Sequence, residues 1–128
     1  FGSGDSNQIT LAIDNLGSNN LYSLEISTSQ FREWEVDGTR YPFQINQDNV
    51  HLDSGIIARL ENPYHKEHYL YVCAGLGEWG TTGAAYYLFR NWEKLYKRFK
   101  KNKNFCLVLE VEVGSDQTAR EVRAFIPD

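Results

Sequence analysis

The sequence predicts an α/β fold, in which a mixed, partly parallel sheet is flanked by helices as in a flavodoxin-like or Rossmann-like sandwich. An apolar run rich in β-forming residues at 69–74 precedes a long helical pattern, and a second apolar run follows at 105–113. The helical pattern consists of apolar residues at steps of four, three and four, at Leu88, Trp92, Leu95 and Phe99. A strand, a helix of about 81–100 and a second strand in this order indicate a βαβ unit.

The remaining elements are predicted from turn residues and short apolar runs. A short helix is expected over 9–16, and Asp37-Gly38 between the runs 32–36 and 39–43 is typical of a two-residue hairpin turn. Pro42 predicts that the second arm of this hairpin is an edge strand. The polar residues 44–49 are expected to form a loop. Strands are further expected at 55–60, paired antiparallel with 69–74, and at 121–126.

Length and composition indicate one globular domain. The chain has 128 residues, of which 41% are hydrophobic and 14% aromatic, and it carries a net charge of −4. Because it begins at Phe1 rather than at Met, we interpret residues 1–128 as a single α/β domain excised from a longer protein. The acidic balance gives no reason to expect a nucleic-acid partner, and no apolar run is long enough to suggest a membrane partner. We therefore expect a cytoplasmic location.

Two glycine-rich turns are the strongest indication of function. The segment 75–80 has the pattern G-x-G-x-x-G between a predicted strand and a predicted helix, and residues 2–7 form a second glycine-rich turn. Amide groups at such a helix N-terminus bind phosphates and nucleotides, and turns at one edge of a sheet form one crevice. The sequence therefore predicts a sensor domain that binds a nucleotide or another phosphorylated small molecule. The predicted ligand-binding residues are Gly2, Gly4, Ser6, Asn7, Gly75, Gly77, Glu78, Trp79, Gly80, Thr81 and Thr82.

Three other interpretations of these turns stay open. The glycines could serve packing alone, which would make the chain a structural, scaffold or surface-layer domain. The chain could instead be a nucleoside or NAD glycosidic hydrolase in which Glu78 is the catalytic residue, with Asp5 or Asp116 as a possible partner. A true NAD fingerprint is disfavoured, because Glu110 and Glu112 lie too far beyond Gly80 to be its acidic residue.

Other reactive residues give weaker patterns. Cys73 and Cys106 lie in apolar strand-like runs outside any C-x-x-C motif, which favours buried thiols. His65 and His68 do not complete a ligand set, so no metal is expected. Basic residues gather at the end of the long predicted helix, where they favour a solvated helix end over a phosphate-rich partner. These are Arg90, Lys94, Lys97, Arg98, Lys100, Lys101 and Lys103.

Several motifs together resemble a family of prokaryotic α/β domains. These motifs are D-x-G-I-I…N-P over 53–63, then A-G at 74–75 and G-T-x-x-A-A at 80–85. In that family a glycine-rich opening turn precedes the same strand and helix start, and related patterns occur in archaeal S-layer-like proteins and in bacterial signalling or defence proteins. The resemblance implies an α/β sandwich embedded in a longer protein, with other domains of that protein as partners. It implies no catalytic mechanism and no cofactor.

Overall fold

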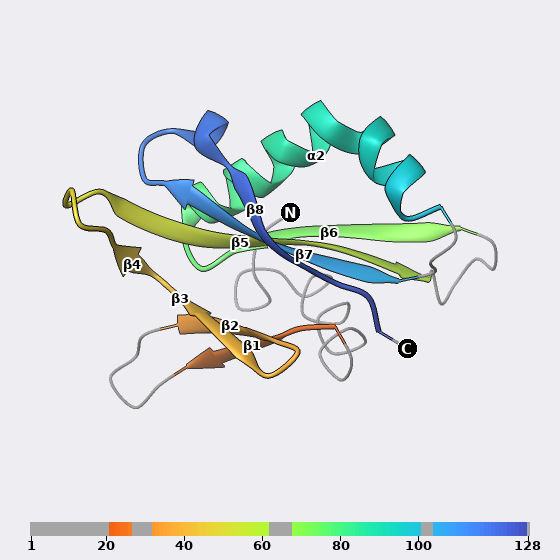
Figure 1. Cartoon of the computed structure of the whole chain (residues 1–128), viewed down its shortest axis with the longest axis horizontal. Coiled ribbons are helices and arrows are strands. Elements are labelled where there is room, and N and C mark those ends of the chain that lie inside the picture. Colours follow the sequence, from red (N-terminus) through yellow and green to blue (C-terminus); the bar gives the residue numbers. More distant parts are fainter. Residues whose placement is uncertain (1–20, 27–31, 62–67, 101–103, 128) are drawn as a thin grey trace.

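The computed structural model describes residues 21–26, 32–61, 68–100 and 104–127, and these form three layers. A five-stranded sheet lies in the middle, helix α2 covers one of its faces, and a three-stranded sheet covers the other (Figure 1). The predicted helix 9–16, the turn 2–7 and any strand before Phe1 lie outside the described residues.

All strand pairs in the described part of the chain are antiparallel. The three-stranded sheet has the order β1-β2-β3, and the larger sheet has the order β4-β5-β7-β8, with β6 pairing with β5. The smaller sheet contains β1 Ser23–Ile26, β2 Arg32–Val36 and β3 Thr39–Pro42. The larger sheet contains β4 Gln44–Ile45, β5 His51–Glu61, β6 Tyr69–Gly75, β7 Phe105–Glu112 and β8 Arg120–Phe125. The helical elements are α2 Glu78–Arg98 and the 3-10 turn η1 Asp116–Thr118.

The predicted fold class is wrong, and the position of β5 explains why. Strands β6 and β7, which α2 connects, both run antiparallel to β5 and lie on either side of it. They therefore point in the same direction without pairing with each other. The βαβ prediction assumed that the two strands would be neighbours in a parallel sheet. The described residues form a mostly antiparallel β fold with one α-helix, and not a flavodoxin-like or Rossmann-like sandwich.

Local predictions from turn chemistry were more accurate. The hairpin between β2 and β3 is confirmed, with Asp37 at φ 50° and Gly38 at φ 78°, the left-handed values that a tight turn between twisted strands requires. Strand β3 lies at an edge of its sheet, as Pro42 predicted. The predicted pairing of 55–60 with 69–74 is also confirmed. The predicted loop at 44–49 was incorrect at its start, because Gln44 and Ile45 pair with the beginning of β5.

Strand β5 is the centre of the molecule because both of its faces are covered. Residues 52–60 are all buried. Ile56, Ala58 and Leu60 face the three-stranded sheet, whereas Ile57 and Arg59 face α2. A strand covered on both sides requires a nearly continuous apolar run, and the segment GIIARL supplies one that only Arg59 interrupts.

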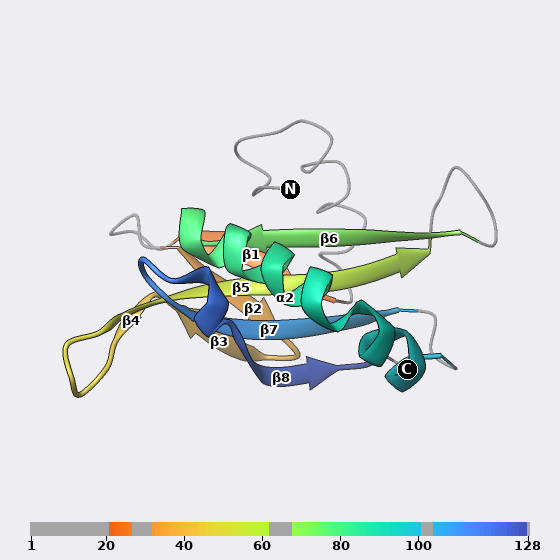
Figure 2. The same cartoon turned by 90° about the horizontal axis from the view of Figure 1, so that it is seen from above.

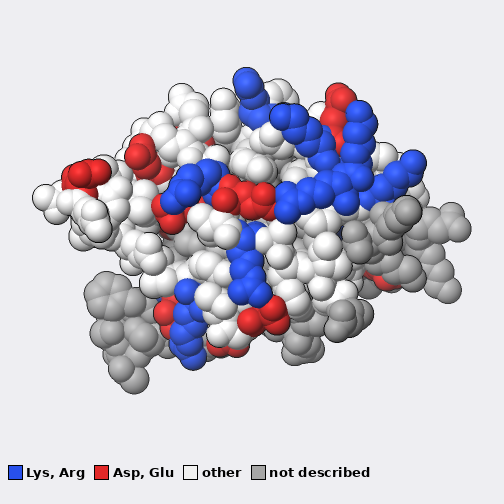
Figure 3. Space-filling view, in the orientation of Figure 1, with Lys and Arg blue, Asp and Glu red and all other residues white. Residues whose placement is uncertain are grey.

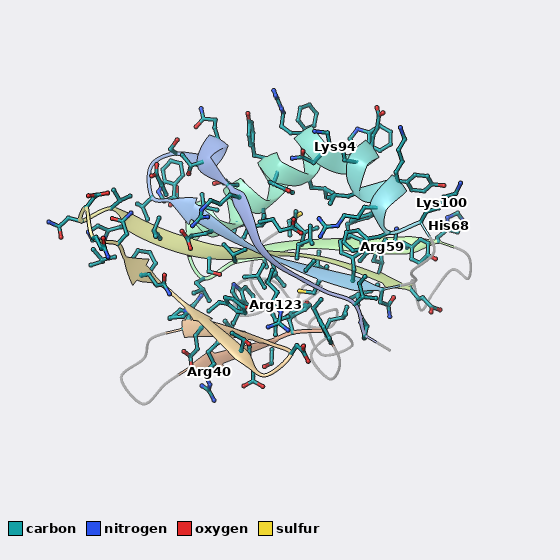
Figure 4. All side chains as sticks on the ribbon, in the orientation of Figure 1. Arg40, Arg59, His68, Lys94, Lys100 and Arg123 are labelled. Atoms are coloured by element: carbon teal, nitrogen blue, oxygen red, sulfur yellow. The ribbon has the colours of Figure 1, made fainter. Side chains whose placement is uncertain are left out.

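Two separate cores hold the layers together. The core between the sheets centres on Trp34, which is fully buried, contacts the ring of Tyr22 edge-on and donates a hydrogen bond from Nε1 to the carbonyl of Ser54 at 3.1 Å. The core under α2 centres on Phe99 and Phe105, whose rings stack at 4.0 Å. Arg123 on β8 also reaches the hairpin of the smaller sheet, donating to Asp37 at 2.5 Å (Figure 4).

Candidate functional site

The glycine-rich turn between β6 and α2 already holds an anionic group, and that group belongs to the protein. The carboxylate of Asp53, on β5, accepts hydrogen bonds from the amides of Gly77 at 3.1 and 3.2 Å and of Gly80 at 2.7 Å. It also accepts one from the amide of Ser54 at 2.8 Å. The amides of Gly77 and Gly80 are ones that a helix start leaves without a partner in the helix itself, and a carboxylate there also complements the positive end of the helix dipole. Asp53 therefore caps α2 from β5, a strand that is distant from the helix in the sequence but lies against it in the fold.

The glycines of this turn allow the helix to lie directly on the sheet. A Cβ atom at Gly75 would lie 2.2 Å from the amide nitrogen of Thr81, and one at Gly80 would lie 2.6 Å from the carbonyl oxygen of Ser54. A Cβ atom at Gly83 would lie 2.6 Å from the side chain of Val111 on β7. At Gly77 it would lie 2.8 Å from Asp53 Oδ2, so a larger residue there would disturb the cap itself. Close packing thus accounts for these four glycines.

Asp53 is almost fully buried, and burial affects its ionisation. Burial raises the pKa of the Asp53 carboxyl above its ordinary value, while the amides of Gly80, Ser54 and Gly77 act in the opposite direction. Among the described residues, the groups that donate hydrogen bonds to this carboxyl are all backbone amides. Its role in the described structure is to satisfy backbone donors.

The other end of α2 is held by a cation from the same strand. Arg59 is buried and donates from Nη2 to the carbonyl of Phe99, the C-terminal cap residue, at 2.6 Å. Its guanidinium lies over the rings of Tyr69, at 4.6 Å, and of Phe105, at 5.0 Å. Figure 4 shows Arg59 between the sheet and the last turn of the helix. Strand β5 thus places an acid at the positive end of α2 and a base at its negative end.

The predicted ligand-binding residues are only partly placed by the structure. Gly2, Gly4, Ser6 and Asn7 lie outside the described residues. Gly75, Gly77 and Gly80 lie together under the start of α2, packed against β5 as described above.

The side chains predicted to contact a ligand are directed to the helix or to solvent. The hydroxyls of Thr81 and Thr82 donate to the carbonyls of Gly77, at 3.1 Å, and Trp79, at 3.4 Å, within the first turn. Glu78 is exposed and makes no hydrogen bond or ion pair with the described part of the chain. Trp79 is half-buried.

The other reactive groups of the described segments are also accounted for. Cys73 and Cys106 are buried free thiols, and burial raises the pKa of Cys73 to about 12 and that of Cys106 further. They occupy opposite faces of the sheet, Cys73 in the core under α2 and Cys106 in the core between the sheets. No three His, Cys, Asp or Glu side chains gather as metal ligands within the described ranges. No helix in those ranges is long and apolar enough to cross a membrane.

A cavity beside Asp53 is too small to hold a nucleotide. Its volume is about 30 Å³, whereas pockets for small molecules measure roughly 300 Å³ or more, and its walls include Ser54, Gln44 and Glu110. The hydroxyl of Ser54 is buried there without a hydrogen-bond partner in the described structure.

The outer face of α2 carries an unexpected group of exposed aromatic rings. Phe89, Trp92 and Tyr96 have 77%, 58% and 53% of their surface exposed. Steps of three and four place them on one stripe of the helix. Arg98 pairs with Glu121 of β8 at 2.8 Å, and at 100° per residue the three rings lie on the opposite side of α2 from Arg98. Trp92 was predicted to belong to the buried face, and this prediction was wrong because the step pattern does not separate the centre of an apolar face from its margin.

Basic side chains lie on other sides of the same helix, since Lys94 is two residues from both Trp92 and Tyr96 and therefore points away from them. Residues 89–100 contain five cationic residues and one anionic residue, Glu93. Figure 3 shows Lys and Arg side chains gathered over the C-terminal half of α2, and Figure 4 shows Lys94 on the helix and Lys100 beyond its end. The phrase "aromatic stripe" below denotes Phe89, Trp92 and Tyr96.

Sequence reasoning missed both Asp53 and Arg59 as functional residues of the fold. A signal was present, because Asp53 and Arg59 are charged residues in a largely apolar strand. They are an even number of positions apart, so their side chains point to the same face of the strand. Charged side chains are rarely buried unless they are paired. The pattern therefore indicated buried partners on one face of the strand, although not which partners.

Comparison with known proteins adds no further evidence. Neither models of protein families, nor curated proteins, nor solved structures give a match to this chain. The resemblance to a prokaryotic α/β domain family stays a prediction, and the α/β fold that it implied is replaced by the antiparallel fold described above.

Proposed function

We propose that this domain recognises a partner protein through the aromatic stripe of α2. The observation that carries the proposal is the stripe of Phe89, Trp92 and Tyr96, three large rings exposed together on one helix. The solvent face of a helix in a soluble domain is ordinarily polar, and contiguous apolar surface on such a face is typical of interaction sites. Tryptophan and tyrosine are also enriched among the residues that contribute most to binding energy at protein interfaces.

The rest of the fold gives these rings no other role. None of the three makes a ring contact or a hydrogen bond with the described residues. The helix is anchored instead through Ala84, Leu95 and Phe99 on its buried side. Since α2 forms the outermost layer on its side of the sheet, its outer face is accessible to a large partner (Figure 2).

Nucleotide binding at the glycine-rich turns stays a prediction with less support. The amides of Gly77 and Gly80, which would bind a phosphate, are hydrogen-bonded to Asp53. A phosphate at the same amides would have to displace a buried carboxylate or lie beside it, and like charges at such distances repel. The proposal therefore keeps the prediction of a recognition domain. It places the binding site on the exposed rings of α2 instead of on the glycine-rich turns.

Selection from a random library of 16-residue peptides displayed on phage tests the proposal. Selected peptides are expected to bind the wild-type domain and to lose at least tenfold in affinity towards the variant F89S/W92S/Y96S. The matched control is F43S/I45S. It removes two apolar residues that are 43% and 58% exposed and that lie just before and in β4, a strand at the edge of the larger sheet. Failure to enrich any peptide, or peptides that bind the triple variant as tightly as the wild type, would contradict the proposal.

A further inference from the structure

We infer that a segment of the partner protein docks beside the aromatic stripe as an added β-strand, paired with the outer edge of β6 and carrying large uncharged side chains at alternate positions. This inference rests on the proposed function and adds the conformation and chemistry of the partner to it. The evidence is the direction in which the stripe points, two further exposed rings on β6, and the composition of β6 as an edge strand.

The aromatic stripe lies on the side of α2 that is turned toward β6. At 100° per residue, its three rings lie on the opposite side of the helix from Arg98, which pairs with Glu121 of β8. In the larger sheet, β8 and β6 lie on opposite sides of the pair formed by β5 and β7. The rings are therefore turned away from β8 and toward the edge of the sheet that β6 forms.

Strand β6 adds two exposed rings on the same face of the sheet. Tyr69 and Tyr71 are 44% and 40% exposed, and they share a strand face with Cys73, which belongs to the core under α2. They are exposed because α2 crosses the strands obliquely, so that its last turns lie over β7 and β8 (Figure 2). The beginning of β6 and the aromatic stripe thus border the same exposed part of the sheet.

Strand β6 lacks the features that usually protect an edge strand. Among the described residues it pairs with β5 alone, so alternate residues direct their amide and carbonyl groups away from the sheet. Its seven residues, YLYVCAG, contain no charge and no proline, and its register with β5 is regular. An edge of this composition tends to aggregate unless a partner covers it.

The other edge strands in the described part of the chain are protected. Strand β8 carries Arg120, Glu121 and Arg123, and its pairing with β7 contains a register shift. Strand β3 ends at Pro42, and β1 and β4 are only four and two residues long. Because charges, proline, bulges and short strands all hinder strand pairing, β6 is the described edge that is suited to accept a further strand.

The chemistry of the partner follows from this position. An added strand directs every second side chain to the α2 side of the sheet, where it would lie beside Tyr69, Tyr71 and the aromatic stripe. Large uncharged side chains bury the most apolar surface there. Arg90 and Lys94 lie on other sides of α2 and give no reason for an acidic partner.

Two other occupants fit less well. A helix could cover the rings, but it would leave the outward amide and carbonyl groups of β6 unpaired. Strand β6 of a second copy would present Cys73 and Gly75 among its side chains on the α2 side, and these are too small to reach the aromatic stripe.

Two phage libraries of nine-residue segments test the inference. Both draw four positions from Val, Leu, Phe and Tyr and the others from Ser, Thr and Gln. One library places the apolar residues at alternate positions, and the other places them at i, i+3, i+4 and i+7. We expect the alternating library to be enriched on the wild-type domain at least tenfold more than the helical one. The opposite result, or no enrichment from the alternating library, would overturn the inference, while the random library decides separately whether the stripe binds a protein.

Methylation of single backbone nitrogens in an enriched peptide tests strand pairing directly. Two versions carry the methyl group at neighbouring central positions, and their affinities are measured by fluorescence anisotropy. Since alternate amides of a strand face its neighbour, we expect one version to lose at least tenfold in affinity and the other less than threefold. Equal affinities of the two versions, whether retained or lost, would overturn the added strand.

Variants of the domain locate the bound peptide. Tyr71→Lys and F89S/W92S/Y96S are each expected to weaken binding at least tenfold, with thermal unfolding as the check that they fold. Val122→Lys is the matched control, because Val122 is also 40% exposed but lies on β8, and it should change the affinity less than threefold. Loss in the triple variant alone would keep docking on the stripe and overturn the added strand. Loss in Tyr71→Lys alone would place the strand away from the stripe and also overturn the inference.

Amide hydrogen exchange distinguishes the remaining occupants of the edge. In the free domain we expect alternate amides of β6 to exchange rapidly at every protein concentration and to become protected when the peptide binds. Protection that increases with protein concentration would indicate a second copy. Protection that is complete at low concentration would show that the chain itself covers the edge. Either result would overturn the inference.

Discussion

The two halves of α2 differ in how they meet their surroundings. The first part, from Glu78 to Ala85, is rich in glycine and alanine. Gly80 lies directly against the backbone of Ser54 on β5, and Gly83 lies directly against the side chain of Val111 on β7. The second half carries large aromatic and basic residues, and three of its rings face solvent. The glycine-rich motif, which is the more conspicuous of the two in the sequence, serves to pack the helix on the sheet. The second half has no such motif, yet it carries the exposed aromatic rings that the packing of the fold does not require.

The largest effect is expected from adding a methyl group under the first half. In Gly75→Ala the new Cβ would lie 2.2 Å from the Thr81 amide nitrogen and 2.4 Å from the Gly80 carbonyl carbon, and both are backbone atoms that cannot move independently. We expect a loss of about 4 kcal/mol in the free energy of unfolding, or failure to fold. Urea denaturation measures it. Thr82→Ala, at an exposed position of the same helix, is the control and should cost less than about 0.5 kcal/mol.

Removal of the cap should have the next largest effect. Asp53→Ala would leave the amides of Gly77 and Gly80 without their acceptor, which we expect to cost about 2–3 kcal/mol. Asp53→Asn retains one acceptor oxygen and should lose less. An alanine variant as stable as the wild type would show that the carboxylate does not hold the helix.

The pH dependence of stability tests whether the ionisation of Asp53 is linked to folding. Because burial raises the pKa of Asp53 above 3.8, the folded state retains a proton at pH values where the unfolded chain has lost it. The contribution of Asp53 to the free energy of unfolding should therefore decrease as the pH rises from about 4 through the raised pKa. Urea denaturation at a series of pH values measures this slope. A slope that is equally steep in Asp53→Asn, which does not titrate, would assign it to other groups.

The smallest effect is expected in the second half. Phe89, Trp92 and Tyr96 are each more than half exposed and belong to neither core, so replacing any one of them by Ser should alter stability by less than about 1 kcal/mol. Leu95→Ala is the matched control, because Leu95 lies on the buried side of the same turns, and it should cost about 3 kcal/mol. Losses of similar size at Trp92 and Leu95 would mean that the rings are part of the core.

The sequence was sufficient for the local elements. The dipeptide Asp37-Gly38 predicted the hairpin because few residues adopt positive φ at both positions of such a turn, and the apolar periodicity around Leu88 and Leu95 predicted the helix. These predictions depend on neighbours in the chain, and such interactions can be read from a single sequence.

The fold class and the site depended on contacts between distant residues. Nothing in the segment 69–113 shows that β5 lies between β6 and β7, since strand order is set by packing across the whole chain. Glycines that admit a phosphate and glycines that admit a neighbouring strand have the same sequence pattern. Only the position of Asp53, 24 residues before Gly77, distinguishes the two in this structure.

The burial of β5 on both faces has a kinetic consequence. From residue 55 to residue 60 its backbone pairs with β6, β7 or both, and its side chains belong to both cores, so no local opening exposes these amides without separating two layers. Amide hydrogen exchange at residues 55–60 should therefore proceed only through global unfolding, and these residues should report the full stability of the domain. The exposed side chains in the second half of α2 do not belong to either core. They can therefore change during evolution without loss of the fold.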